Sequence, residues 1–291
     1  MMLKNTLFVS ILITLLSCSS VNSTYTTTSS STAVKPFHEQ IKGVNWRAKK
    51  VHKHLRWNHH QFPQLFSSVQ SITVVEIKLK KSLTVAVDYV ARGFTKTSDF
   101  GRSANALLAI NGSFFNTKVG GSNVFLKKEG RIISETAAGF DAFRENAGIT
   151  ISDDGTVDIV AKPTTGWQVL QTPTVLTSGP LLLMHGNLVP QQAHKFNTKR
   201  HPRTAIGLTE DGRLLAVVVD GRSANAQGVT IEELSQLMLA LGCEKAMNLD
   251  GGGSSTAWIK GEGVVNYPSD NKQFDHQGER AVANAILINI Q

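Results

Sequence analysis

The chain has 291 residues, and its 30 lysines and arginines against 22 aspartates and glutamates give a formal net charge of +8. This length is enough for one large domain or two modest ones. Only Cys18 and Cys243 occur, which excludes a fold held together by several disulfides and leaves a hydrophobic core as the source of stability. We interpret Cys243 as a small core residue rather than a reactive thiol.

The N-terminus has the pattern of an export signal. Lys4 precedes an apolar run, Leu7 to Leu16, that is too short to span a bilayer as a stable helix. The run ends in Leu15-Leu16-Ser17-Cys18, which resembles a bacterial lipobox, so residues 1–17 are predicted to be a lipoprotein signal peptide and Cys18 the lipidated residue. Lipid chains would hold the protein in the bacterial cell envelope. Ser19 after the cysteine indicates the periplasmic side of the outer membrane or the cell surface.

Residues 18–40 are predicted to be a tether, because the stretch from Ser19 to Thr32 is almost entirely serine and threonine and cannot bury enough apolar surface to fold. A basic segment follows, with four histidines among Arg47, Lys49, Lys50, Lys53 and Arg56. Export argues against nucleic acid as its partner. Anionic lipid or an anionic glycopolymer fits better, and a solvated basic face with no partner is the simplest explanation.

The folded domain is predicted to cover residues 41–291. Period-two alternation of apolar residues around glycine turns predicts four hairpins, at Ile72–Leu79 with Leu83–Val90, Val124–Ile133, Ile149–Val160 and Ala205–Val219. Thr230 and Glu233 form a capping box for an amphipathic helix that ends at Gly242. Further strands are expected at Ala246–Leu249, Ala257–Val265 and, centrally in a sheet, Val282–Ile290. Hairpins with few helices predict an α+β domain of largely antiparallel β-sheets.

The stretch Asn248–Thr256 places Asp250, three glycines and three hydroxyls together. It is not a P-loop, since no lysine follows the glycines, and not a serine-hydrolase elbow, since Thr256 stands where the closing glycine belongs. An EF-hand loop needs oxygen side chains where this stretch has glycines. Glycines let a ligand approach backbone N–H groups closely, so three of them beside an acid favour a ligand site over a plain turn.

Seven segments in order resemble the phosphodiester glycosidase domain family of the "uncovering enzyme" type, from about Ile72 to the C-terminus. They are Ala109–Phe115, Ser178–Pro180, Arg203–Gly207, Asp220–Arg222, Leu241–Cys243, Asn248–Thr256 and Gly278–Asn284. The resemblance implies hydrolysis of sugar-1-phosphodiesters between sugar C1 and the phosphate oxygen, which releases free sugar and a phosphomonoester. Ala281 stands where family members often have proline. The sugar-binding loops do not match, so no sugar preference is implied.

The resemblance also implies a set of substrate-binding residues. Arg203 and Arg280 are the expected phosphate ligands, because a guanidinium binds two oxygens in a fork. Asn111 is expected to bond a sugar hydroxyl or an acetamido group, with Phe114 or Phe115 packed nearby. The remaining candidates lie in the same matched segments: Thr204, Arg222, Gly251, Gly252, Gly253, Ser254 and Thr256.

The catalytic carboxylate near C1 is expected to be Asp250, with Glu279 second and Asp220 third, although Val219-Asp220-Gly221 is equally an ordinary hairpin exit. Two carboxylates at about 5 Å would suit retention of configuration and a gap of roughly 6.5–9.5 Å inversion, so both outcomes stay open. The histidines show no metal-ligand spacing, and we predict no metal and no cofactor. The expected substrate is a sugar-phosphate glycan or phosphoglycolipid; the alternative is a non-catalytic lipoprotein that binds an anionic cell-wall glycopolymer.

Overall fold

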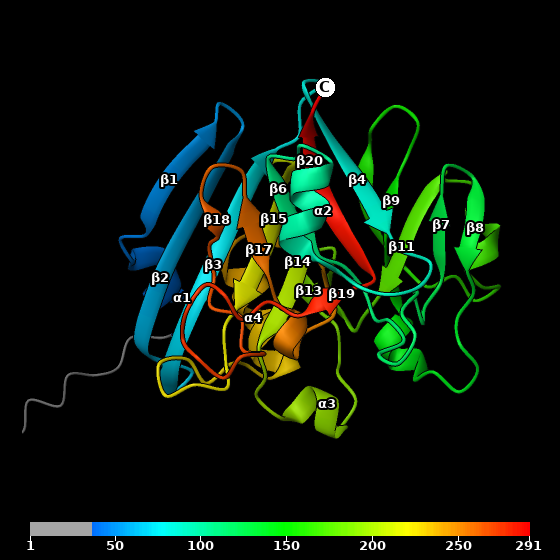
Figure 1. The fold of residues 1–291 in the computed structure, drawn as a ribbon. Helices are drawn as coiled ribbons and strands as arrows, with labels where there is room; N and C mark the ends of the chain where they lie inside the picture. Colours follow the sequence, from blue (N-terminus) through cyan, green and yellow to red (C-terminus); the bar gives the residue numbers. More distant parts are fainter. Residues whose placement is uncertain (1–36) are drawn as a thin grey trace, which may run out of the picture. The chain divides into compact units, whose positions relative to one another are not determined.

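The computed structural model describes residues 37–291 (Figure 1). The predicted signal peptide, Cys18 and most of the predicted tether lie outside the described residues. Helix α1 (Phe37–Gly43) begins within the predicted tether rather than at residue 41, and its Ile41 is buried. Regular structure therefore starts before the predicted domain boundary.

Antiparallel sheets dominate the fold, as the sequence predicted. The largest has the order β1-β2-β3-β15-β14-β16-β12-β13. Its strands are β1 (Arg47–His52), β2 (Leu55–Leu65), β3 (Ser68–Lys78), β15 (Arg213–Val219), β14 (Arg203–Thr209), β16 (Cys243–Asn248), β12 (Leu181–Met184) and β13 (Asn187–Leu188). A five-stranded sheet contains β18 (Gly263–Val264), β17 (Ala257–Ile259), β6 (Leu108–Asn111), β20 (Asn284–Ile290) and β4 (Leu83–Tyr89), in that order.

A second five-stranded sheet and a short strand pair complete the β-structure. The sheet contains, in order, β10 (Val157–Ala161), β9 (Ala147–Ile151), β11 (Thr174–Ser178), β7 (Leu126–Lys128) and β8 (Arg131–Ser134), and the pair is β19 (Ala281–Val282) with β5 (Thr95–Lys96). The other helices are α2 (Thr97–Ser103), α3 (Lys195–Thr198) and α4 (Ile231–Ala240), with 3-10 turns η1 (Ala142–Glu145), η2 (Trp167–Val169) and η3 (Gly252–Ser254). Within residues 37–291 no helix is both long and apolar enough to cross a membrane.

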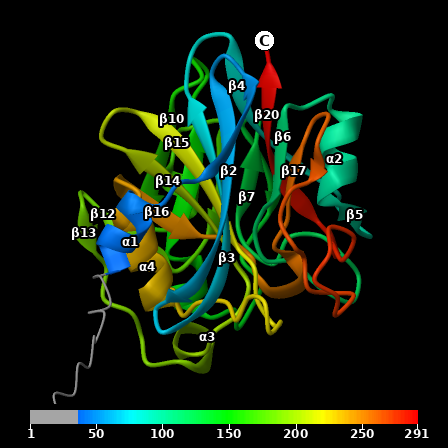
Figure 2. The same ribbon diagram turned by 90° about the vertical axis from the view of Figure 1, so that its left-hand side faces the viewer.

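The sheets stack as layers, with helices on the outside (Figure 2). The central core joins the inner faces of all three large sheets, for example Ile206, Ile286 and Ile149. On its outer face the eight-stranded sheet packs against α1 and α4, and Cys243 lies buried in this layer as interpreted from the sequence. Helix α2 covers the outer face of the β20 sheet. The eight-stranded sheet and the β20 sheet are thus each covered on both faces, by the central core on one side and by helices on the other.

Three of the four predicted hairpins are confirmed: β7 with β8, β9 with β10 and β14 with β15. The fourth prediction is wrong, because β3 pairs with β2 and β15 whereas β4 pairs with β20 in another sheet. Apolar residues of both β3 and β4 enter the same core. Alternation shows that each strand has a buried face, but not whether two strands pair side by side or face each other across the core.

Candidate active site

The glycine stretch connects β16 of the eight-stranded sheet to β17 of the β20 sheet. Strand β16 ends at Asn248, and the chain then bonds to three other segments: Asp250 N donates to Gly112 O (3.0 Å), Gly252 N to Pro202 O (2.9 Å) and Arg280 N to Gly253 O (3.2 Å). Gly112 follows β6, and Pro202 precedes β14. The turn is therefore a junction at one end of the strands, held by backbone hydrogen bonds.

Glycine is required at this junction by close contacts as well as by backbone angle. Gly252 has a φ of +65°, a value that favours glycine. A methyl group at Gly252 would lie 3.0 Å from Arg222 Nη2, and one at Gly253 would lie 2.6 Å from Arg280 Nη2 and 2.3 Å from Asp270 Oδ1. The missing side chains allow two guanidinium groups to lie directly against the turn.

Asp250 is partly exposed at the rim of the turn. Burial raises the pKa of its carboxyl above the ordinary 3.8, opposed by Ser254, the Gly251 N–H and the charges of Arg144 and Arg280. The Ser254 hydroxyl lies near the carboxylate, but its distance and angle do not make a hydrogen bond. A carboxylate that is partly desolvated yet still accessible, with two arginines close by, is an arrangement typical of functional sites.

The arginines near Asp250 form one cluster. Arg280 pairs with Asp270 (Nη2 to Oδ1, 2.5 Å) and also interacts with Asp250, which together raise its pKa. The charges of Arg144 and Arg222 contribute to lowering the pKa of Arg203, so these three lie near one another. Arg222 is exposed and has a φ of 62°, which is unusual for a residue with a side chain. The cluster favours an anionic ligand.

Arg203, an expected phosphate ligand, is held in place by the protein itself. Its side chain is only 1% exposed, and it donates to backbone carbonyls, from Nε to Val229 O (3.1 Å) and from Nη2 to Phe196 O (2.6 Å) and Lys199 O (3.0 Å). Burial is the main cause that lowers its pKa, to about 9. These bonds engage Nε and Nη2, so Arg203 anchors neighbouring loops and adds positive charge near the turn.

Asn111 and Thr204, both expected to bind substrate, are likewise engaged by protein partners. Asn111 is fully buried; its Nδ2 donates to Asp250 O (2.7 Å), and its Oδ1 accepts from Thr204 Oγ1 (2.8 Å) and Thr256 N (3.1 Å). The amide thus ties the ends of β6, β14 and β16 together. Its position directly beneath Asp250 makes it a positioning residue for the turn.

Glu279, the second candidate for the catalytic carboxylate, lies at the start of helix α2. The backbone N–H of Ser98 donates to Glu279 Oε2 (3.1 Å), and the Ser98 hydroxyl donates to Oε1. The neighbouring Arg280 instead lies against Gly253. Successive residues in an extended segment point to opposite sides, so Glu279 and Arg280 serve different surroundings.

Asp220 is buried beside the turn rather than accessible in it. Its carboxylate accepts from Ser71 Oγ (2.6 Å), Asn266 Nδ2 (2.9 Å) and Tyr267 N (2.8 Å), and burial raises its pKa to about 6. Asn266 also donates to Ser255 O and accepts from Ala257 N. Asp220 therefore supports the segment after the glycines through Asn266.

Three consecutive hydroxyls follow the glycines. The side-chain oxygens of Ser254, Ser255 and Thr256 are buried, and none has a hydrogen-bond partner in the structure. Buried hydroxyls in proteins are normally satisfied. Two of them, Ser254 and Thr256, are among the substrate-binding candidates predicted from the sequence.

Arg144 is a candidate that sequence reasoning missed. Its guanidinium carbon lies 4.4 Å from the ring centre of Phe114, 5.1 Å from that of Phe140 and 4.7 Å from that of Phe196. Its neighbour Glu145 is fully buried and accepts from Phe125 N (2.7 Å), which anchors η1. The signal in the sequence was an arginine just after Phe140 and Phe143. Phe115, by contrast, belongs to the core beneath α2.

The described cavities and acidic clusters do not add a metal site. Within residues 37–291 no three His, Cys, Asp or Glu side chains gather as metal ligands.

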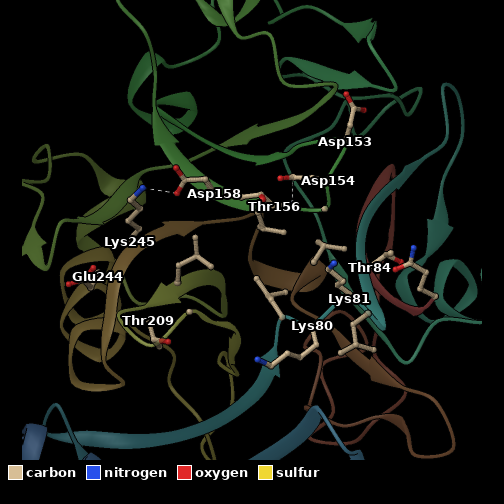
Figure 3. Close-up of a pocket in the computed structure, with 18 residues that line it drawn as sticks. Lys80, Lys81, Thr84, Asp153, Asp154, Thr156, Asp158, Thr209, Glu244 and Lys245 are labelled. Carbon is tan, nitrogen blue, oxygen red and sulfur yellow. Dashed lines mark hydrogen bonds and ion pairs between the residues drawn. The ribbon is translucent and has the colours of Figure 1, made fainter.

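A cavity of about 720 Å³ lies at the other end of the strands, lined by Lys80, Lys245, Asp158 and neighbours (Figure 3). Because none of its lining residues belongs to the glycine turn or the arginine cluster, we place the candidate site at Asp250 on the chemistry rather than on cavity size.

An acid among several arginines, at the end of antiparallel sheets, is the arrangement of a protein that binds an anionic ligand. The profile of the family described as "NAGPA: Phosphodiester glycosidase" matches residues 104–289, well over half of the chain. The chain belongs to the phosphodiester glycosidase family, a family of hydrolytic enzymes, as the resemblance implied.

Individual relatives agree with this assignment. The mouse N-acetylglucosamine-1-phosphodiester alpha-N-acetylglucosaminidase is 29% identical over 188 residues, 58% of this chain and 35% of the mouse protein. The SPbeta prophage-derived uncharacterized protein YomE of Bacillus subtilis is 42% identical over 89 residues, 31% of this chain and 13% of YomE. The chain thus spans about a third or less of the length of these relatives.

A solved structure shows the same fold. The catalytic domain of the zebrafish N-acetylglucosamine-1-phosphodiester alpha-N-acetylglucosaminidase, auto-inhibited by its pro-peptide, superposes with a TM-score of 0.66 at 21% identity. The match covers 85% of this chain and 89% of the zebrafish chain. At this level of identity the likeness establishes the fold.

Proposed function

We propose that this protein hydrolyses sugar-1-phosphodiesters at the bond between sugar C1 and the phosphate oxygen, releasing free sugar and a phosphomonoester. One observation carries the proposal: the accessible carboxylate of Asp250 lies among arginines at a glycine turn. Family membership supports the same reaction.

Phosphate binding falls to the arginines whose guanidinium groups lie at the turn. Arg222 and Arg280 lie against Gly252 and Gly253, and Arg144 interacts with Asp250. When the C1–O bond breaks, its electron pair moves to the phosphate oxygen, and preorganised positive charge stabilises that developing negative charge. Because a phosphomonoester is already a good leaving group, no strong general acid is required.

Asp250 is the base in this scheme. It is the one of the three candidate carboxylates that is accessible at the turn, since Glu279 is bound to Ser98 and Asp220 is enclosed by hydrogen bonds. Its raised pKa makes the ionised form a stronger base for a water proton. The water oxygen bonds to C1 on the face opposite the departing phosphate, so the configuration at C1 is inverted.

The direct test is turnover of a panel of sugar-1-phosphate methyl diesters that vary in sugar and anomer, N-acetylglucosamine included. We expect release of free sugar, and proton NMR at early times should show the anomer opposite to that of the substrate. Failure to turn over any member of a broad panel would refute the proposed reaction. A product of retained configuration would instead refute the role of Asp250 as base.

We also propose that the protein is anchored in a bacterial cell envelope through lipid on Cys18, where a sugar-phosphate glycan or phosphoglycolipid would be its substrate. The motif Leu15-Leu16-Ser17-Cys18 supports this location. Labelled palmitate should be incorporated by the full chain and not by a Cys18→Ser variant. Equal labelling of the two chains would contradict the anchor without bearing on the reaction.

A further inference from the structure

A second charged region lies at the end of the strands away from Asp250. The β1–β2 hairpin and the β14–β15 turn border a hollow of about 700 Å³, which we call the basic hollow. Six lysines and arginines line it against two carboxylates. Its charged and histidine residues are Lys49, Lys50, Lys53, Arg56, Lys78, Arg213, His52, His54, Glu76 and Asp211.

Both carboxylates of the hollow are already neutralised. Glu76 accepts from Arg56 (2.9 Å) and Arg213 (2.7 Å), and Asp211 pairs with Arg213 (2.8 Å). Lys49 pairs with Glu262 (2.7 Å), which is not part of the hollow. Among the ion pairs of residues 37–291 none involves Lys50, Lys53 or Lys78, so three lysines leave the hollow with uncompensated positive charge.

The positive potential of the hollow acts on His54. Burial is the first cause that lowers the pKa of His54, and the charges of Lys53, His52, Lys80 and Lys78 add to it. These side chains therefore lie near one another although they come from separate turns. Mutual repulsion among lysines is unfavourable without a partner, and an anionic ligand would relieve it.

The neighbouring cavity provides a contrast (Figure 3). Its lining includes three lysines but four carboxylates, and Lys245 pairs with Asp158 at 2.6 Å. Positive and negative side chains face each other in that view, so the cavity has no charge excess for an anion. Of the two cavities at this end, the basic hollow is the one whose charge selects a polyanion.

Geometry indicates the size of the ligand. Strand β14 links the two ends, because Arg203 starts it beside the glycine turn and Thr209 ends it just before Asp211 of the hollow. Its seven residues span about 20 Å at a rise of ~3.3 Å per residue. A single sugar phosphodiester is too short to reach both regions, whereas a chain of repeating phosphate groups can.

We propose that the basic hollow is a binding site for a linear, phosphate-rich polyanion, separate from the Asp250 site. A chain fits better than a membrane surface, because the lysines line a concavity and none of the exposed large hydrophobic side chains of residues 37–291 borders it. Membrane-binding faces combine basic residues with exposed apolar ones. That the bound chain also feeds the Asp250 site rests on the proposed function; its binding does not.

The test compares two charge-matched triple variants of the full chain. One carries Lys50→Ala, Lys53→Ala and Lys78→Ala; the control carries Lys42→Ala, Lys96→Ala and Lys118→Ala, which are exposed lysines outside the hollow. Binding of fluorescein-labelled inorganic polyphosphate is followed by anisotropy over a range of salt. The hollow variant should bind about 30–100-fold more weakly at low salt, at roughly tenfold or less per lysine. The slope of log K against log salt should fall by about 2–3.

The control variant should bind polyphosphate within about threefold of the unaltered protein. Equal loss in both triple variants would show that net charge, not the hollow, drives binding, and would overturn the inference.

Binding to vesicles that contain phosphatidylglycerol is measured as a second experiment. A larger loss on vesicles than on polyphosphate would assign the hollow to a membrane instead. Both variants should keep turnover of a small sugar phosphodiester. If the unaltered protein binds polyphosphate but hydrolyses no sugar phosphodiester, only the proposed function is refuted.

Discussion

The two ends of the strands carry positive charge in different ways. At the glycine turn Arg203 is held by backbone carbonyls and is 1% exposed, Arg144 lies among three aromatic rings, and Arg280 pairs with Asp270. In the basic hollow the side chains of Lys49 and Arg56 are 57% and 58% exposed, and the lysines there project from turns and an edge hairpin. Arg203 and Arg144 have therefore already lost rotamer entropy on folding, whereas the exposed side chains of the basic hollow lose theirs only when a ligand binds.

If the two proposals hold, this fold places catalysis at one end of the strands and polyanion binding at the other. Fixed charges act on a transition state without reorganising, so they belong beside the reacting carboxylate. Mobile lysines adapt to successive phosphates, and their attraction is long in range and sensitive to salt. The following predictions test the contrast, beginning with the change expected to have the largest effect.

Replacing Asp250 with asparagine should lower kcat by about 10²–10⁴-fold, the usual contribution of a general base. Substrate affinity should be kept or improved, because the variant removes a negative charge from an anion site. In the unaltered protein, activity should fall as pH decreases through the raised pKa of Asp250, since the base must be ionised. Steady-state kinetics on a sugar phosphodiester measure both effects. Asp153→Asn, at an exposed turn of the far end, is the control and should behave as the unaltered protein.

Asp220 is expected to make the free energy of unfolding depend on pH. Its pKa is about 6 in the folded chain against an ordinary 3.8, so between these values the folded state holds the proton and the unfolded state does not. Unfolding free energy should therefore fall as pH rises from about 4 to above 6, by about 3 kcal/mol from this group. Urea unfolding at several pH values should show a shallower pH dependence for Asp220→Asn than for the unaltered chain. An unchanged dependence would mean that Asp220 is ionised throughout.

Arg144→Lys should raise KM for a sugar phosphodiester about tenfold and lower the melting temperature by only a few degrees. Lysine keeps the charge but loses the planar group that lies against three phenylalanine rings, worth about 1 kcal/mol or more. Arg131→Lys, in the exposed β7–β8 hairpin, is the matched control. If both variants have the same KM, Arg144 does not contact the phosphate and the aromatic cluster serves packing only.

The smallest effect is expected for Glu279→Gln. Loss of its charge at the start of α2 should lower stability by about 0.5–1 kcal/mol, and kcat should change less than about twofold. Thermal unfolding and the same kinetic assay provide the two readings. A loss of activity as large as that of Asp250→Asn would return Glu279 to the catalytic site.

Local sequence was sufficient for many elements. The capping box of α4, the turns of three hairpins and the glycine stretch are encoded within short windows, and the structure has them where expected. The β3–β4 hairpin failed because alternation reports a buried face and not the identity of the neighbouring strand. The predictions for residues 1–36 lie outside the described part of the chain.

Residue roles at the site were less accessible from sequence. Asp250, Arg222 and Arg280 could be named as neighbours because they lie in matched motifs, and the structure brings them to one turn. Glu279 and Arg280 lie in the same matched segment, so the motif placed both at the site. Only the structure shows that the two side chains point to opposite sides. Arg144 was missed because its environment consists of Phe114, Phe140 and Phe196, which are distributed along the chain.

The amino-acid sequence by itself determined the family, the antiparallel α+β character and the glycine turn with its acid, because these depend on residues close together in the chain. Only the tertiary structure decided that Arg203 and Asn111 bond to neighbouring loops, and that lysines of β1, the β1–β2 turn and β3 line one hollow. The physical reason is that a polar side chain bonds to whichever partner folding brings within reach, and that partner is set by long-range packing.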